Sequence, residues 1–298
     1  MIGVSGGPDS ICLLDVLYKL KDKYNLELIV AHVNYGLRGK DSEKDEQLVK
    51  KLAKKYSFPT EIFQTTRYKL QTTNLEERLR IVRYAFFEKI SKKYKASTIA
   101  VAHNLNDQAE TVLMRILRGT GLKGISAIKF RNSNIVRPLL NIPRKEIVTY
   151  LRSNKIPYRI DKTNLTLDFT RNKIRNKLLP ELEKDFNPNI QKLLCKFSES
   201  AAADYNFLSR FAKEWLEANR NLQVSALNNL HPSILNEILR QTLEKHVPGL
   251  RNIESAHIEE IIKILKSGKN KRQKIAFKGL KIGRIGDKLI IEKSGKNF

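Results

Sequence analysis

The first half of the chain alternates short apolar runs with longer amphipathic segments. The apolar runs have the length and β-branched content of strands, and the segments between them carry apolar residues at helical spacing. We therefore expect strands at residues 26–34, 60–66 and 97–103, and helices at residues 42–56, 75–94 and 106–117. This alternation is typical of a parallel sheet covered by helices, which is an α/β fold.

The pattern changes near Asn187 and Pro188. Before this point we expect a helix over 143–154, a short strand at 158–161 and a basic helix that Pro180 closes. After it, helical periodicity covers 190–216, 231–245 and 254–265, and three strand-like runs follow at 274–277, 280–285 and 288–291. Two domains are predicted: an open, doubly wound parallel sheet over residues 1–186, and a smaller, mainly helical domain with a short β tail over residues 187–298.

The charge of the chain points to a polyanionic partner. Its 56 lysines and arginines against 31 acidic residues give a net charge of +25, spread over the whole length. Such an excess is typical of nucleic-acid binding, and solvated basic surfaces are the alternative. Cys12 and Cys195 form no CxxC pair, so neither a disulfide framework nor a structural zinc site is expected. Because no apolar run reaches the ~20 residues of a membrane helix and no signal peptide is visible, we expect an intracellular protein with no membrane partner.

The stretch SGGPDS at residues 5–10 lies between a short apolar strand and an amphipathic helix. A glycine-rich turn before a helix directs backbone N–H groups and the positive end of the helix dipole at an anion, and hydroxyls add donors. The stretch lacks the lysine and the length of a Walker A loop. Its Asp9 requires a divalent cation or an ammonium group if phosphates bind here. A turn capped by Asp9 or Ser10 is the alternative.

This stretch matches the SGGxDS loop of the N-type ATP pyrophosphatases, the PP-loop superfamily, whose members form AMP and pyrophosphate from ATP. Further segments resemble the tRNA(Ile)-lysidine synthetase family: AHVNYGLRG with acidic DSEKDE after it, NLEERLRIVRYAFF and AHNLNDQAETVLMRILRGTGLKGI. RPLLNIPRKEI and DKTN…RNKIRNKLLPEL complete the order over about residues 3–188. The resemblance implies a Rossmann-like sheet of the PP-loop ATPase type for the first domain.

The resemblance also implies a reaction. The C2 oxygen of the wobble cytidine in tRNA(Ile) with anticodon CAU would attack the α-phosphate of ATP, and the ε-amine of free L-lysine would then displace AMP. The implied cofactors are ATP and Mg²⁺, and the implied partners are this tRNA and free L-lysine. The second domain is expected to bind the tRNA. The implied location is the cytoplasm or the plastid stroma, and the oligomeric state stays open, with a homodimer among the options.

Roles for single residues follow from the same resemblance. The residues expected to bind ATP are Ser5, Gly6, Gly7, Pro8, Asp9, Ser10, His32 and Asn34. The residues expected to be catalytic are Asp9, Asp107, Arg80, Arg83 and His103, with Asp9 and Asp107 also as ligands of Mg²⁺. The residues expected to bind lysine or tRNA are Gln108, Glu110, Thr111, Arg171, Asn172 and Arg175.

Structural alternatives stay open for these residues. The two histidines could be hydrogen-bonded residues at strand ends, and the helix dipole alone could favour Asp107. Glu110 could pair with Arg115, and the arginines could form solvated helix faces. The family often carries a second histidine where this chain has Asn104, which weakens any role for two imidazoles acting together.

Three other functions compete with this one. A tRNA-thiolating enzyme of the same superfamily would need a sulfur relay such as CxxC, and the two cysteines fit small core residues better. An amidating ligase such as an NAD or GMP synthetase would not need the charge of +25. A non-catalytic RNA-binding protein would not need the intact polar loop. The chain begins four residues before Ser5, so its first strand is expected to be short, and its end near residue 298 resembles an architecture with one C-terminal domain.

Overall fold

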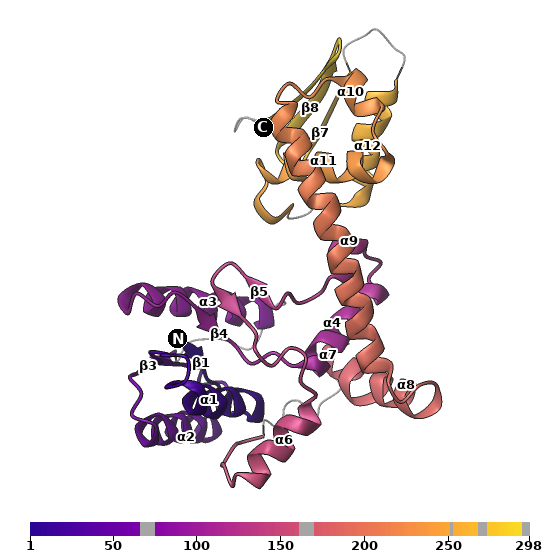
Figure 1. Ribbon diagram of the computed structural model, residues 1–298. Helices are drawn as coiled ribbons and strands as arrows, with labels where there is room; N and C mark the ends of the chain where they lie inside the picture. Colours follow the sequence, from indigo (N-terminus) through magenta and orange to yellow (C-terminus); the bar gives the residue numbers. More distant parts are fainter. Residues whose placement is uncertain (66–74, 161–169, 251–252, 268–272, 294–298) are drawn as a thin grey trace. The chain divides into compact units, whose positions relative to one another are not determined.

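The computed structural model describes residues 1–65, 75–160, 170–250, 253–267 and 273–293. These residues form two compact units, Met1–Ala201 and Ala202–Phe298 (Figure 1). Each unit has its own buried apolar core. No helix in the described ranges is long and apolar enough to cross a membrane.

Unit 1 is built around a six-stranded sheet with the order β3-β2-β1-β4-β6-β5. Its strands are β1 (Ile2–Gly3), β2 (Val30–Asn34), β3 (Thr60–Gln64), β4 (Ile99–Ala100), β5 (Arg131–Asn132) and β6 (Ile135–Val136). All neighbouring strands run parallel except β5 and β6, which pair antiparallel. The chain order reverses between β1 and β4, and ligands of open α/β sheets bind at the carboxyl ends of the strands at such a point.

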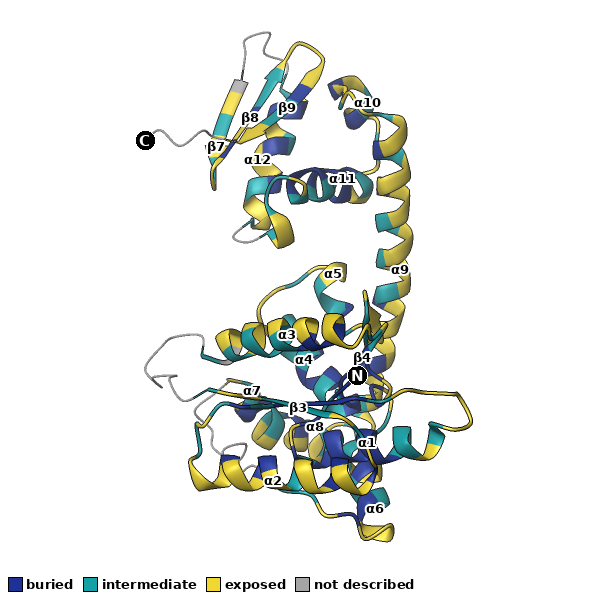
Figure 2. Ribbon diagram, turned by 90° about the vertical axis from the view of Figure 1, so that its left-hand side faces the viewer, coloured by how far each residue is buried: buried dark blue, intermediate teal, exposed yellow. Residues whose placement is uncertain are grey.

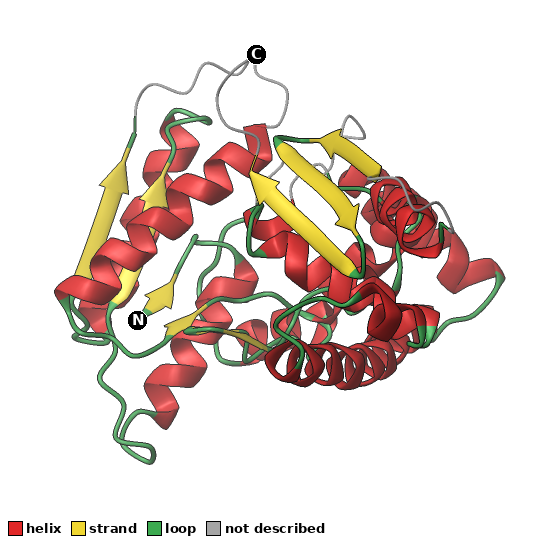
Figure 3. Ribbon diagram, turned by 90° about the horizontal axis from the view of Figure 1, so that it is seen from above, coloured by secondary structure: helices red, strands yellow, loops and turns green. Residues whose placement is uncertain are grey.

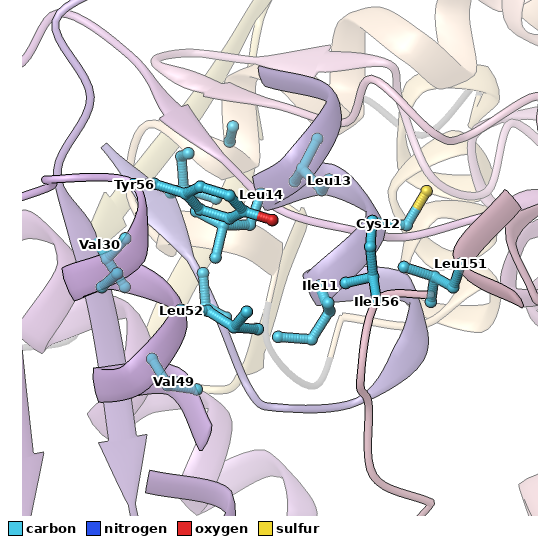
Figure 4. Close-up of a cluster of buried hydrophobic side chains, with 14 of the residues drawn as sticks. Ile11, Cys12, Leu13, Leu14, Val30, Val49, Leu52, Tyr56, Leu151 and Ile156 are labelled. Carbon is cyan, nitrogen blue, oxygen red and sulfur yellow. The ribbon is translucent and has the colours of Figure 1, made fainter. Parts of the chain in front are cut away.

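Helices cover both faces of this sheet (Figure 1). Those of unit 1 are α1 (Pro8–Leu20), α2 (Lys40–Lys55), α3 (Leu75–Lys93), α4 (Leu105–Leu117), α5 (Leu122–Ile125), α6 (Arg144–Ser153), α7 (Thr170–Lys173), the π-helix η2 (Ile174–Leu178) and α8 (Leu179–Asp185). Leu14 of α1, Leu52 of α2 and Leu151 of α6 pack in one buried cluster (Figure 4). Phe87 and Ile90 of α3 belong to a separate cluster on the other face. The prediction of a doubly wound, mostly parallel sheet is confirmed.

Two local predictions in unit 1 are wrong. Tyr158–Ile160 is not a strand, and the N–H of Arg159 donates to the carbonyl of Gly6 instead of joining a sheet ladder. Pro180 does not close its helix, because it lies at the start of α8, which continues to Asp185. The wide π turn η2 directly before it makes room for a ring that an α-helix interior would not accept. Residues 66 and 161 of the expected strands lie outside the described ranges.

The boundary between the units lies inside the long helix α9 (Ile190–Ala218), after Ala201, and not at 186/187 as expected. The first part of α9 packs on α4, where Cys195 forms a small cluster with Leu105 and Ala109. The side chain of Gln108 also donates to Ser198 Oγ at 2.8 Å. These contacts assign the start of the helix to unit 1.

Unit 2 combines helices with a small antiparallel sheet in the order β7-β8-β9 (Figures 2 and 3). Its elements after α9 are α10 (Val224–Asn228), α11 (Pro232–Glu244), the 3-10 turn η3 (Pro248–Leu250), α12 (Ser255–Lys266), β7 (Gln273–Phe277), β8 (Leu280–Ile285) and β9 (Lys288–Lys293). Leu239 of α11, Leu265 of α12 and Leu280 of β8 share its core. The expected mainly helical architecture with a short β tail is confirmed.

Candidate active site

The SGGPDS stretch forms a tight turn between β1 and α1. Gly6 adopts a φ of +92°, which favours glycine, and Gly7 is the extended N-cap residue of α1. Ser10 Oγ donates to the carbonyl of Gly7 at 3.0 Å and accepts the Ser5 N–H at 3.1 Å. Pro8 occupies the first turn of the helix, where its missing N–H has no intrahelical partner to lose. The turn therefore places the N-terminus of α1 at the carboxyl end of β1.

Asn104 joins two carboxylates at the N-termini of α1 and α4. Its Nδ2 donates to Asp9 Oδ1 at 2.9 Å, and its Oδ1 accepts the Asp107 N–H at 3.0 Å. Asp107 Oδ2 in turn accepts the Asn104 N–H at 3.1 Å, which completes a capping box. Sequence reasoning treated Asn104 only as a departure from the family. The signal that could have found its role is an asparagine three residues before an aspartate at a helix start.

The surroundings of Asp9 leave its negative charge only partly compensated. Burial raises the pKa of Asp9, and the neighbouring Asp107 charge raises it further, against the opposing effect of Arg144. The Arg144 Nη1 atom lies 3.7 Å from Asp9 Oδ2. Two neighbouring carboxylates whose charges raise each other's energy favour a bound cation.

The donor set fits Mg²⁺ held together with a substrate. Mg²⁺ is usually bound through one or two carboxylates plus phosphate oxygens and water. Within the ranges that the structure describes, no cluster of three or more His, Cys, Asp or Glu side chains could hold a metal ion. A Mg²⁺ ion at Asp9 and Asp107 would therefore take its remaining ligands from phosphates and water.

A cavity of about 210 Å³ opens beside this loop at the ends of β1, β2 and β4. The polar turn lines it with Ser5, Gly7, Asp9 and Ser10. The opposite wall consists of Tyr35 after β2, of Arg83, Tyr84 and Phe87 from α3, and of His103 after β4. Sequence reasoning missed the three aromatic residues. The alternation of β2 could have indicated Tyr35, because it lies two residues after Val33, which also faces the cavity.

One buried polar atom of the cavity wall, His103 Nδ1, has no hydrogen-bond partner among the described residues. Unpaired buried polar atoms are rare in folded proteins, so this nitrogen is a candidate for hydrogen bonding to a bound molecule. Burial and the nearby charges of Arg137 and Arg83 lower the pKa of His103 to about 3. Its imidazole is therefore neutral at physiological pH and suits hydrogen bonding better than proton transfer.

Arg80 and Arg83 lie against the same aromatic ring. Their Cζ atoms are 5.4 Å and 5.5 Å from the centroid of Tyr84. Arg83 lines the cavity, whereas Arg80 is not among its lining residues. Arg137, which follows β6, is buried and donates to the carbonyl of Lys129. The arginines gathered here give this wall a strong positive potential.

Glu110 is held by two arginines and not by the alternative partner Arg115. Arg175 Nε lies 2.5 Å from Glu110 Oε1, and Arg171 Nε lies 2.9 Å from Glu110 Oε2. Both guanidinium groups also reach Asp107 Oδ1, at 3.2 Å and 3.4 Å. Glu110 is only 1% exposed, whereas the Arg171 and Arg175 side chains are partly exposed. The structure thus brings together four of the predicted site residues from α4, α7 and η2.

The other predicted substrate-binding residues have partners within the protein. The Gln108 side chain bonds Ser198 and both backbone groups of Ile128, and Thr111 Oγ1 donates to the carbonyl of Asp107 within α4. Asn172 is buried in α7.

His32 and Asn34 do not line the cavity. Both are buried, because alternate residues of β2 face opposite sides of the sheet and these two face away from Val33. His32 Nδ1 bonds the carbonyl of Val4 at 2.7 Å, and Asn34 Nδ2 donates to Glu46 Oε2 at 2.8 Å. The alternative of a hydrogen-bonded residue at a strand end therefore describes His32.

The fold and this loop define an ATP-binding protein of the PP-loop class. The sequence profile of the PP-loop domain matches residues 1–182, and the chain belongs to this family. Its sequence is similar to that of curated tRNA(Ile)-lysidine synthases, which confirms the resemblance found in the motifs. The enzyme of Clostridium tetani is 36% identical over 297 residues, covering 96% of this chain and 64% of the relative. That of Clostridium acetobutylicum is 41% identical over 276 residues, covering 88% and 59%.

The chain spans about 59% to 66% of the length of the curated relatives it matches. The fold also occurs in a solved structure of the U34-tRNA thiolase NcsA from Methanococcus maripaludis with its [4Fe-4S] cluster. The two chains superpose with a TM-score of 0.58 at 20% identity, over 68% of this chain and 70% of that chain. At this identity the likeness concerns the fold.

Proposed function

We propose that this chain carries the catalytic part of a tRNA(Ile)-lysidine synthase. It would convert the wobble cytidine of tRNA(Ile) with anticodon CAU to lysidine, using ATP and free L-lysine and releasing AMP and pyrophosphate. The observation that carries the proposal is the convergence of Asp9 and Asp107 on a PP-loop, beside a cavity in which the buried His103 Nδ1 has no partner among the described residues.

The reaction proceeds in two steps. The C2 oxygen of the cytosine attacks the α-phosphorus of ATP, the bond to the bridging oxygen breaks and pyrophosphate leaves. The neutral ε-amine of lysine then attacks C2, the bond from C2 to the adenylate oxygen breaks and AMP leaves, while the nitrogen releases its proton to solvent.

Each group of residues has a part in this proposal. The turn of Ser5, Gly7 and Ser10 binds the departing pyrophosphate at the N-terminus of α1. Asp9 and Asp107 are the residues that would hold Mg²⁺, which when bound would neutralise phosphate charge. Asp107 presents a carboxylate that can orient the ammonium group of lysine, and Arg171 and Arg175, which Glu110 holds in place, can bind its carboxylate.

The base and the tRNA would contact the opposite wall. Neutral His103 and Tyr84 offer hydrogen-bonding atoms to a nucleobase, and Arg83 with Arg80 attracts the phosphates that flank it. The basic charge of the chain, +25 in total, favours a tRNA partner. As a tRNA-modifying enzyme the protein would act in the cytoplasm.

The two cysteines count against tRNA thiolation. Cys12 and Cys195 are both buried, and burial raises the pKa of their thiols to about 11 and about 12. A sulfur relay needs accessible thiolates, which such thiols do not provide at neutral pH.

The test is lysine transfer to tRNA. Purified protein is incubated with ATP, Mg²⁺, radiolabelled lysine and a tRNA(Ile) transcript bearing CAU, with a transcript carrying U at the wobble position as substrate control. We expect label only in the CAU transcript. Asp9→Asn should abolish incorporation, whereas Asp22→Asn, a change at a side chain that is 92% exposed, should not. Absence of label with wild-type protein would refute the proposal, and sulfur incorporation would replace it with thiolation.

A further inference from the structure

We propose that Asp45 and Arg159 are positioning residues that fix the PP-loop in its anion-binding conformation. This inference rests on the proposed binding of ATP at that loop. Asp45 belongs to the acidic DSEKDE stretch, which the proposed reaction does not otherwise use.

The link to the loop is made by the backbone of Arg159. Its N–H donates to the carbonyl of Gly6 at 3.1 Å. No strand includes Tyr158–Ile160, so a sheet ladder does not fix this segment. Its position therefore depends on other contacts, which include the packing of Tyr158 against the core and the ion pairs of the Arg159 side chain.

The side chain of Arg159 is tied to α2 at two points. Its Nε lies 2.5 Å from Asp45 Oδ1, and its Nη2 lies 2.8 Å from Asp41 Oδ1. Asp45 is 6% exposed, and its second oxygen pairs with Arg38 Nη2 at 2.5 Å. A carboxylate shielded from water and bonded to two guanidinium groups is a rigid anchor, because charge-assisted hydrogen bonds are short and directional.

Asp45 also touches the loop directly. A Cβ atom built on Gly6 would lie 3.3 Å from the Cβ of Asp45 and 3.5 Å from its backbone. The turn thus lies close to α2 at Gly6, whose φ of +92° favours glycine.

The contact with Arg159 fixes the orientation of the peptide unit between Gly6 and Gly7, which bears on anion binding. The carbonyl of Gly6 and the N–H of Gly7 belong to one trans peptide unit, so they point in opposite directions. Gly7 lines the cavity and Gly6 does not. Arg159 binds the Gly6 carbonyl on one side of this peptide unit, and on the other side the Gly7 N–H donates to Ser5 Oγ at 3.4 Å, between two residues that line the cavity. If the peptide flipped, a carbonyl oxygen would face the phosphates and repel them.

Arg38 supplies a matched control. It pairs with the same carboxylate as Arg159 but makes no hydrogen bond to the PP-loop in the described residues. Arg38→Met and Arg159→Met therefore each remove one guanidinium from Asp45, and only the second releases the segment that holds Gly6.

The experiment measures the binding of pyrophosphate and of ATP by titration calorimetry, with the KM for ATP and for lysine in the transfer assay. Arg159→Met should weaken pyrophosphate binding and raise the KM for ATP by about tenfold or more, the loss expected for a charge-assisted contact. The KM for lysine should stay unchanged, Arg159→Lys should restore part of the affinity, and Arg38→Met should bind pyrophosphate as the wild type does.

Equal effects of Arg38→Met and Arg159→Met, or an unchanged affinity in Arg159→Met, would overturn the inference while leaving the proposed function intact. Should Arg159→Met fail to fold, Asp41→Asn tests the same link through its exposed contact and should weaken pyrophosphate binding to a smaller extent. Wild-type protein that binds neither pyrophosphate nor ATP would overturn the proposed function together with this inference.

Discussion

Substitution of Asn104 by alanine and by serine distinguishes its role as the cap of α4 from its hydrogen bond to Asp9. The residue is 1% exposed and caps α4, while its amide N–H group bonds Asp9. Asn104→Ala removes both interactions. Asn104→Ser keeps an oxygen that can accept the Asp107 N–H, but its side chain ends one atom too early to bond Asp9 as well.

The expected magnitudes follow from these contacts. Loss of an N-cap costs about 1 kcal/mol, and loss of a hydrogen bond to a charged group costs about 1.5 to 3 kcal/mol. Asn104→Ala should therefore lower the free energy of unfolding by roughly 2.5 to 4 kcal/mol. Asn104→Ser should lower it by about 1 kcal/mol less, because the serine still caps the helix.

Urea denaturation followed by circular dichroism measures the stability, and lysine transfer to tRNA measures the activity. Both variants should lose activity to a similar extent, since both release Asp9, although the serine variant is more stable. Equal unfolding free energies for the two variants would show that the cap contributes nothing. Full activity in Asn104→Ser would refute the positioning of Asp9 by Asn104.

Four further predictions concern the same unit. Gly3→Ala should lower the unfolding free energy by about 1 to 3 kcal/mol in urea melts, because its Cβ would lie 2.6 Å from the ring of Phe87, and a neutral result would refute this clash. Glu110→Gln should lower it by about 1.5 to 3 kcal/mol, because it replaces the buried carboxylate that Arg171 and Arg175 share, while both arginines keep Asp107, and a loss below about 0.5 kcal/mol would contradict this. Burial alone would raise the pKa of Glu46, but hydrogen bonds from neighbouring side chains outweigh it and lower the pKa to about 2. Its stabilising effect is complete above the ordinary pKa of 4.5 and is lost as the pH falls toward 2, so Glu46→Gln should flatten the acid side of the stability curve. The pKa of about 3 for His103 means that its ring signals in NMR should stay constant from pH 5 to 8, and a midpoint near 6.5 would disprove its burial among arginines.

The short-range features of this protein could be predicted from the sequence. The SGGPDS stretch, the strand before it, the helix after it and the strands of the small C-terminal sheet depend on residues close together along the chain. Glycine conformations, helix caps and apolar periodicity act over a few residues, so the sequence carries them directly. The motifs also indicated the family and the loop at which the candidate site lies.

Which residues far apart in the sequence become hydrogen-bond partners was decided by the tertiary structure. Asn104 and Asp9 are 95 positions apart and meet because β1 lies between β2 and β4. The same packing turns His32 away from the cavity and brings Arg159 to Gly6. A charged or amide side chain can bond many partners with similar local energy. Which one it bonds is decided by the strand order and by the cost of burying it unpaired, and both are properties of the whole fold.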